Sequence, residues 1–114
     1  MQYKSDVEAL VLAALAQCPQ HGYGLVKAIQ GGSSGLFRLN EGRLYPLLHK
    51  MQAKGWIAGT WESDQTGPAR KTYTLLESGA KELEARRADW DRFSQAVSAV
   101  LSAGERPKTE VQHG

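Results

Sequence analysis

The sequence is poor in the residues that build disulfide frameworks and metal sites. Cys18 is the only cysteine, so no disulfide can form within one chain. The three histidines, His21, His49 and His113, are scattered, and no Cys/His/carboxylate cluster has metal-ligand spacing. We therefore predict no metal site. Cys18 is interpreted as an inert small residue beside Pro19, because a redox role requires a reactive, accessible thiol.

Long apolar runs are also missing. No stretch approaches the roughly 20 apolar residues that span a bilayer, and the first residues, MQYKSDVEAL, lack the charged-then-apolar pattern of a signal peptide. With one cysteine, these features predict a cytoplasmic protein without a membrane partner. The segment Gly31–Gly35 is not followed by Lys and Ser/Thr, and no nucleophile–base–orienter set is recognisable. An enzyme and a bound cofactor are therefore not expected.

Neither sign of charge dominates the composition. The chain has 14 Lys and Arg against 12 Asp and Glu, a net charge of +2, which alone is weak evidence for a nucleic-acid partner. The distribution is more informative. From Leu36 to Leu75 six basic residues stand against three acidic ones, whereas residues 1–35 balance to zero and residues 76–106 balance to −1. The excess positive charge therefore falls on one segment, as expected for a surface that meets phosphates.

Two helices are predicted before that segment. Ser5 and Glu8 have capping-box spacing, so the first helix is predicted to begin near Asp6 and to end before Pro19. The second is predicted over residues 23–30. The predicted buried positions of these helices are Val7, Leu10, Val11, Ala14, Leu15, Leu25, Ala28 and Ile29.

A third helix follows the breaker Gly31–Gly35, with Asn40 as its N-cap and Gly55 at its end. Pro46 lies beyond the first turn, so the helix is predicted to kink there or to start late. The predicted buried stripe is Leu44, Leu47, Leu48 and Met51. The opposite face carries Gly42, Tyr45, Pro46 and His49, flanked by Arg43 and Lys50.

The rest of the chain predicts a hairpin and one long helix. Residues 56–62 and 70–75 are rich in β-formers, and the connection SDQTGPA is too long for a tight turn. Ser78 and Gly79 are predicted to precede a final helix that runs to about Ala103. The fold class is therefore mainly α with a small β-hairpin: a winged helix-turn-helix plus a long C-terminal dimerisation helix.

Three parts are predicted along the chain. Residues 1–76 form the winged helix-turn-helix DNA-binding domain, residues 77–103 form the dimerisation helix, and residues 104–114 form a disordered tail. The apolar seam of the last helix is Leu83, Trp90, Phe93, Val97, Val100 and Leu101. From Trp90 to Val100 its spacing alternates three and four, as in helix-packing seams.

The predicted partner is double-stranded operator DNA, with the third helix in the major groove. Arg43 is the candidate for a guanine contact, because a guanidinium group matches O6 and N7 bidentately. Lys50 is expected to meet a phosphate. The complete predicted DNA-binding set is Tyr23, Asn40, Arg43, Tyr45, His49, Lys50, Arg70 and Lys71.

Two other interpretations stay open for this surface. A face of Arg, His and Lys is often only solvated. The same hairpin and helix could also contact a protein, in a winged-helix interaction module without ligand response. Such a module would not need the cations of the third helix and of the hairpin, so charge reversal at Arg43 and Lys71 separates it from a DNA reader.

The chain resembles the PadR family of transcriptional regulators. The matching motifs are His21-Gly22-Tyr23-Gly24, Gly42-Arg43-Leu44-Tyr45-Pro46, Gly55-Trp56-Ile57 and Arg70-Lys71-Thr72-Tyr73, within a resemblance that covers roughly Asp6 to Leu101. The resemblance implies a homodimeric repressor that dimerises through its last helix. Two positions depart from the family pattern, because Arg43 and Leu76 stand where a threonine is usual. Arg43 therefore makes the operator sequence hard to transfer from relatives.

The short last helix is similar to that of the smaller PadR subfamily, which includes the multidrug-responsive LmrR-like regulators. That resemblance implies a pocket at the dimer centre, in which Trp90 stacks a planar aromatic effector. The residues predicted to line it are Ser5, Ala9, Ala13, Arg87 and Trp90. A tryptophan on an amphipathic helix is more often a packing anchor than a ligand platform, so we weight dimer packing over stacking for Trp90.

Overall fold

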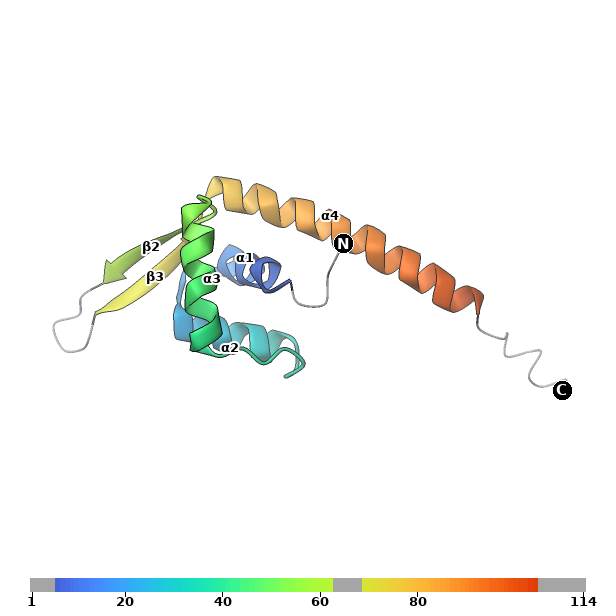
Figure 1. Cartoon of the computed structure of the whole chain (residues 1–114), viewed down its shortest axis with the longest axis horizontal. Coiled ribbons are helices and arrows are strands. Elements are labelled where there is room, and N and C mark those ends of the chain that lie inside the picture. The colour runs from blue at the N-terminus through green and yellow to red at the C-terminus, as the bar shows by residue number, and fades with distance from the viewer. Residues whose placement is uncertain (1–5, 63–68, 105–114) are drawn as a thin grey trace, which may run out of the picture. The chain divides into compact units, whose positions relative to one another are not determined.

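The computed structural model of the chain describes residues 6–62 and 69–104. The chain divides after Glu84 into two compact units, unit 1 (Met1–Glu84) and unit 2 (Ala85–Gly114). The elements, labelled in Figure 1, are α1 (Val7–Gln17), β1 (Gln20–His21), α2 (Gly22–Gly32), α3 (Glu41–Ala53), β2 (Ile57–Glu62), β3 (Arg70–Leu75) and α4 (Glu77–Ala103). The predicted fold class, mainly helical with a small antiparallel sheet and a long last helix, is confirmed.

Helix α1 begins one residue later than predicted and uses a different cap. The Asp6 carboxylate, and not Ser5, accepts a hydrogen bond from the Ala9 amide at 3.0 Å. Ser5 itself lies outside the described residues. The helix ends at Gln17, and Cys18 after it is extended and exposed. The prediction that the helix ends before Pro19 is therefore correct.

Helix α2 is longer than predicted, because the first two glycines of the segment Gly31–Gly35 belong to it. The break comes at Ser33, whose hydroxyl donates to the Ile29 carbonyl oxygen at 2.8 Å. Gly35 follows with a φ of 81°, a left-handed conformation that suits glycine. The prediction that Ala28 points inward is wrong. Ala28 is exposed and Val26 is buried in its place, since the buried face follows the turn from Val26 to Ile29.

Helix α3 begins and ends as predicted. The Asn40 side-chain oxygen accepts from the Arg43 amide at 2.9 Å, which caps its first turn. At the other end Gly55, with a φ of 78°, donates to the Gln52 carbonyl, and the Trp56 amide donates to the Met51 carbonyl. These two bonds form a Schellman motif.

Pro46 lies inside α3, which starts at Glu41 directly after its Asn40 cap, so of the two alternatives predicted for Pro46 the late start is excluded. Proline has no N–H group and leaves the carbonyl of Gly42 without its helical donor. This carbonyl is near the start of α3, where Gly42 is exposed to solvent. The missing hydrogen bond is therefore replaceable by water.

The sheet has three strands in the order β1-β3-β2, and both pairs are antiparallel. The predicted two-stranded hairpin is therefore incomplete. Strand β1 pairs Gln20 with Tyr73 and His21 with Thr72. Two residues are too few to show an alternating pattern in the sequence, which is why β1 was missed. Of the connection between β2 and β3, residues 63–68 lie outside the described residues.

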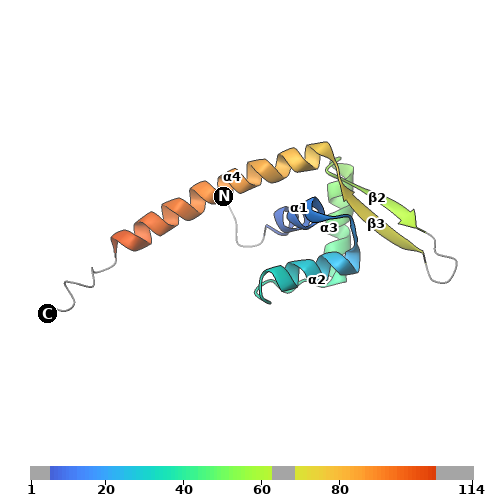
Figure 2. The ribbon, with the colours of Figure 1, turned by 180° about the vertical axis from the view of Figure 1, so that it is seen from behind.

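The core of unit 1 lies where the three helices meet the root of the hairpin, and strands β2 and β3 run out from it as a ribbon (Figures 1 and 2). Leu12 of α1 is fully buried although the predicted face omitted it. The fully buried large side chains are Val11, Leu12, Leu25, Leu44, Leu48, Met51 and Ile57. The core thus joins the start of β2, through Ile57, to the buried face of α3.

Helix α4 begins at Glu77, so Ser78 and Gly79 lie in its first turn and do not precede it. Gly79 is buried against the Trp56 backbone, and Leu83, at 4% exposure, belongs to the core of unit 1. Within residues 6–62 and 69–104, no helix is both long and apolar enough to cross a bilayer.

Candidate nucleic-acid interface

An open groove of about 670 Å³ joins the start of α2, one side of α3 and the hairpin. We call it the aromatic groove. Its lining residues are His21, Gly22, Tyr23, Gly24, Tyr45, His49, Trp61, Ala69, Arg70, Lys71 and Tyr73. Five of the eight predicted DNA-binding residues meet here, from three elements that are distant in the sequence: Tyr23, Tyr45, His49, Arg70 and Lys71.

The walls of the aromatic groove combine accessible rings with cations. Tyr23 is 61% exposed and Trp61 is 67% exposed, whereas Tyr73, which also lines the groove, is buried. The Lys71 ammonium lies 5.7 Å from the centre of the Trp61 ring and 5.6 Å from that of Tyr73. These distances are within the range of cation–π attraction. The rings therefore hold a positive charge inside the groove.

Gly59 makes room for Lys71 on the neighbouring strand. A Cβ atom at Gly59 would overlap the Lys71 side chain at Cε and would lie 3.2 Å from the Tyr73 ring. The lysine stem thus crosses the bare backbone of β2 on its way into the groove. A side chain at position 59 would push the cation away from its two rings.

Gly22 makes room for Tyr45 in the same manner. A Cβ atom at this buried glycine would lie 2.7 Å from the Tyr45 hydroxyl oxygen, closer than real Cβ contacts allow. The Tyr45 hydroxyl therefore rests on the first turn of α2. This contact links the orientation of an α3 side chain to the position of α2.

The floor of the aromatic groove is a neutral phenol. Burial raises the pKa of Tyr73 above 10, and the neighbouring Tyr45 phenol raises it further. Tyr73 therefore stays protonated at neutral pH. Beside it, His21 Nδ1 lies 3.3 Å from both the Lys71 carbonyl oxygen and the Thr72 hydroxyl oxygen, which joins β1 to β3.

The other predicted DNA-binding residues lie away from this groove. Arg43 and Lys50 line a smaller hollow of about 260 Å³, together with Glu8 of α1. Asn40 caps α3 with its side-chain oxygen, which leaves its amide group for a partner. The predicted surface is therefore divided: aromatic rings and wing cations on one side of α3, and further cations on the other.

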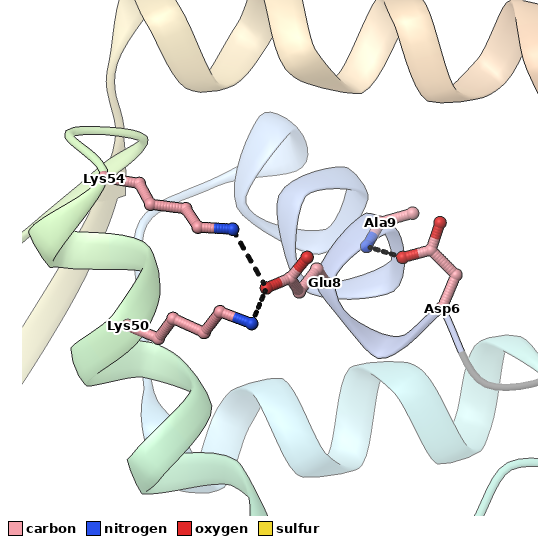
Figure 3. A network of polar contacts seen from close by, with 5 residues as sticks. All are labelled: Asp6, Glu8, Ala9, Lys50 and Lys54. Atoms are coloured by element: carbon pink, nitrogen blue, oxygen red, sulfur yellow. Dashed lines mark hydrogen bonds and ion pairs between the residues drawn. The ribbon is translucent and has the colours of Figure 1, made fainter.

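An acidic side chain lies among the cations of this smaller hollow (Figure 3). The Glu8 carboxylate is 3.8 Å from the Lys50 ammonium and 3.9 Å from the Lys54 ammonium. Lys54 also lies 4.4 Å from the centre of the Trp56 ring. Glu8 was predicted only as part of a capping box, so its contact with α3 was missed.

No group of three or more His, Cys, Asp or Glu side chains in the described parts of the chain is placed to hold a metal ion. The predicted effector residues are divided between the units. Ala9 and Ala13 of unit 1 are half-buried, whereas Arg87 and Trp90 of unit 2 are exposed. Ser5 lies outside the described residues. The effector site stays a prediction.

The apolar residues predicted for the dimer interface have two different environments. Leu83 is buried in the core of its own chain, so its side chain is not accessible to a second copy. In unit 2, the Trp90 and Phe93 rings lie 5.9 Å apart between centres. The exposed residues of the stripe, which we call the α4 stripe, are Trp90, Phe93, Val97, Val100 and Leu101.

Comparison with protein families places this geometry among known proteins. Residues 11–85 match the model of the "Transcriptional regulator PadR-like family". The chain is 29% identical over 94 residues to the transcriptional regulator YqjI of Escherichia coli K12. That match covers 82% of this chain and 44% of YqjI, so the chain spans less than half the length of this curated relative.

Solved structures share the fold. A PadR-like transcriptional regulator from Bacillus cereus is 31% identical, with a TM-score of 0.74 over 87% of this chain and 93% of that one. Bacillus subtilis PadR in complex with operator DNA is 24% identical, with a TM-score of 0.65 over 75% of this chain and 46% of that one. At that lower identity the likeness concerns the fold alone.

Proposed function

This chain belongs to the PadR-like family of transcriptional regulators, and on that premise we propose that it binds operator DNA through α3 and the β2–β3 wing. The observation that carries the proposal is the aromatic groove beside α3. It gathers Arg70, Lys71 and three exposed rings at the place where a winged helix meets the DNA backbone.

The two sides of α3 have different tasks in this proposal. Arg43, near the start of the helix, is assigned to a guanine edge in the major groove, because its guanidinium group forms two parallel hydrogen bonds there. Arg70 and Lys71 are assigned to phosphates, which fix register without reading sequence. Tyr23 and Tyr45 offer hydroxyl groups to the same backbone.

The regulator is proposed to act as a homodimeric repressor. The α4 stripe places five apolar side chains on an exposed helix face, and Trp90, Phe93, Val97 and Val100 alternate three and four apart. A second copy of the same helix buries such a stripe by symmetric packing. Dimerisation places two α3 helices on half-sites one duplex turn apart, about 34–36 Å.

Release from the operator is proposed to follow binding of a planar aromatic effector near Trp90. An effector between the α4 helices would change the spacing of the recognition helices only if it bound the two arrangements with different affinity. Support comes from the exposed ring of Trp90, which is adjacent to Phe93. Fluorescence quenching by planar aromatic compounds, with Trp56 and Trp61 as background, tests this part separately.

Salt-dependent DNA binding tests the proposed function. Fluorescence anisotropy would measure binding to a labelled duplex from the promoter region of the protein's own gene, over 50–300 mM salt. A duplex of random sequence is the control. We expect log Kd to rise linearly with log salt, because each neutralised phosphate releases counterions with a slope of about 0.9. Absence of binding at low salt, or an affinity that ignores salt, would refute DNA recognition.

Substitution of Gly22 by alanine is expected to weaken DNA binding about threefold to tenfold, the worth of one lost hydrogen bond. The new Cβ displaces the Tyr45 ring from the aromatic groove. Anisotropy measures the change, and the melting temperature should fall little because the displaced atoms belong to a side-chain tip. Gly32→Ala is the matched control, because Gly32 lies in the same helix and a Cβ atom there would meet nothing within 4 Å. Equal affinities for the two variants would contradict this role of Tyr45.

Substitution of Trp90 by alanine is expected to weaken the dimer at least about tenfold, as truncation of a large aromatic anchor does. Analytical ultracentrifugation across a concentration series measures the dissociation constant. Trp61→Ala, which removes an exposed tryptophan from the wing, should leave dimerisation unchanged. A fully retained dimer that no longer binds planar aromatics would instead assign Trp90 to the effector.

A further inference from the structure

Glu8 of α1 faces two cations at the C-terminal end of α3, Lys50 within the helix and Lys54 at its C-cap (Figure 3). Its side chain is only 15% exposed, whereas those of Lys50 and Lys54 are 61% and 40% exposed. The carboxylate is thus the less accessible partner, and the two lysines reach toward it from the side of α3 (Figure 3). A half-buried acid paired with two accessible cations is unlike the exposed pair between Glu77 and Lys81 on α4.

The distances make this a loose association. The Glu8 carboxylate lies 3.8 Å and 3.9 Å from the two ammonium groups, beyond the 2.7–3.2 Å typical of a direct hydrogen bond. Each lysine therefore feels the negative charge without being fixed to it. A phosphate approaching α3 would compete with Glu8 for the same cations.

Lys50 and Lys54 are separated by one helical turn, and Arg43 lies two turns before Lys50 on the same side of α3. Arg43 and Lys50 line the smaller hollow together with Glu8. The carboxylate therefore stands beside the cations of α3, Arg43 and Lys50, and beside Lys54 at its C-cap, and it offsets one of their charges.

We propose that Glu8 limits sequence-independent DNA binding by attracting Lys50 and Lys54, so that DNA phosphates must compete with its carboxylate for both cations. The inference rests on the proposed function and concerns the regulation of the same surface. Phosphate contacts supply essentially all of the non-specific affinity of a DNA-binding protein. An internal carboxylate that competes for two lysines lowers that affinity and leaves Arg43 to read bases. Glu8 acts through the lysines, so it is a positioning residue and not a DNA contact.

The test compares Glu8→Gln with Glu77→Gln on a random-sequence duplex by anisotropy over a salt series. Both variants remove one negative charge from an ion pair with lysine. Glu8→Gln is expected to tighten non-specific binding about threefold to tenfold at low salt and to steepen the salt slope by about 0.9 for each lysine released. Glu77→Gln should stay near the native values, because its lysine is not on α3.

Lys50→Gln is a second variant for this test. It leaves the less accessible Glu8 in place, since Lys50 is the more exposed partner of the ion pair. In the native chain this variant should lose less non-specific affinity than Arg70→Gln on the wing, because Glu8 already competes for Lys50. In the Glu8→Gln background the same substitution should cost several times more. A melting curve of each variant verifies folding.

Three outcomes would overturn the inference: a Glu8→Gln salt slope equal to that of Glu77→Gln, weaker binding by Glu8→Gln, or an equal loss for Lys50→Gln and Arg70→Gln. Each of these presupposes a native chain that binds the duplex, so DNA recognition would survive them. A native chain that binds no duplex at low salt would overturn the proposed function together with this inference.

Discussion

Replacement of Gly79 by alanine is expected to destabilise unit 1 by about 3 kcal/mol or more, at the upper end of overpacking substitutions. A Cβ atom there would overlap the Trp56 carbonyl oxygen and lie 2.8 Å from Leu75 Cδ1. The obstacle is backbone, which cannot rotate away as a side-chain tip does. The same carbonyl accepts a hydrogen bond from the Leu76 amide at 2.9 Å, so movement would also break the link between the strands and α4.

The direction of the stability change distinguishes this steric effect of Gly79→Ala from the effect of helix propensity. Alanine in place of a helical glycine normally stabilises by about 0.5–1 kcal/mol. Gly31→Ala is the matched control, because Gly31 lies in α2 and a Cβ atom there meets nothing within 4 Å. Urea or thermal unfolding followed by circular dichroism should give opposite shifts for the two variants. A Gly79→Ala variant as stable as the native chain would show that α4 does not begin in the described contact with Trp56.

The double charge reversal Arg43→Glu and Lys71→Glu is expected to weaken DNA binding by about a hundredfold or more at low salt. Each reversal removes one favourable contact and introduces repulsion from a phosphate-rich surface. Lys71 has a second interaction, because its ammonium lies 5.7 Å from the centre of the Trp61 ring and 5.6 Å from that of the Tyr73 ring at the aromatic groove. The two sites flank α3 from opposite sides, so their effects should be nearly additive.

The double variant also distinguishes DNA recognition from a protein-interaction module. Dimerisation should be unchanged, because neither residue belongs to the α4 stripe, and ultracentrifugation verifies this. The charge-conserving variant Arg43→Lys should keep most of the non-specific affinity while losing discrimination at one base, since lysine lacks the bidentate geometry. DNA binding that survives the double reversal would favour a protein partner for this surface.

Local signals predicted the recognition helix well. The Asn40 cap and the closing Gly55 stand where they were predicted. Of the predicted stripe, Leu44, Leu48 and Met51 are buried and Leu47 is partly buried against the same core. A cap, a helical period and a left-handed glycine are local properties of the chain. Sequence patterns report such properties directly.

Contacts between distant segments were not predictable in this way. Strand β1 is two residues long and exists because Gln20 and His21 meet β3 some fifty residues later. The contact of Tyr45 with Gly22 and that of Glu8 with Lys50 join separate helices in the same manner. The family motif around Gly22 marked an important position, but only the fold shows that its missing side chain accommodates a tyrosine ring.

The central place of β3 in the sheet makes the position of the wing cations an all-or-none property. A shift of one residue would turn every side chain of the strand to the opposite face. Lys71 and Tyr73 share one face, so a slipped strand would withdraw the cation from the groove and Tyr73 from the core together. Because β1 and β2 both hold the register, errors in wing geometry should appear as unfolded protein, and folded molecules should all present the same charge pattern.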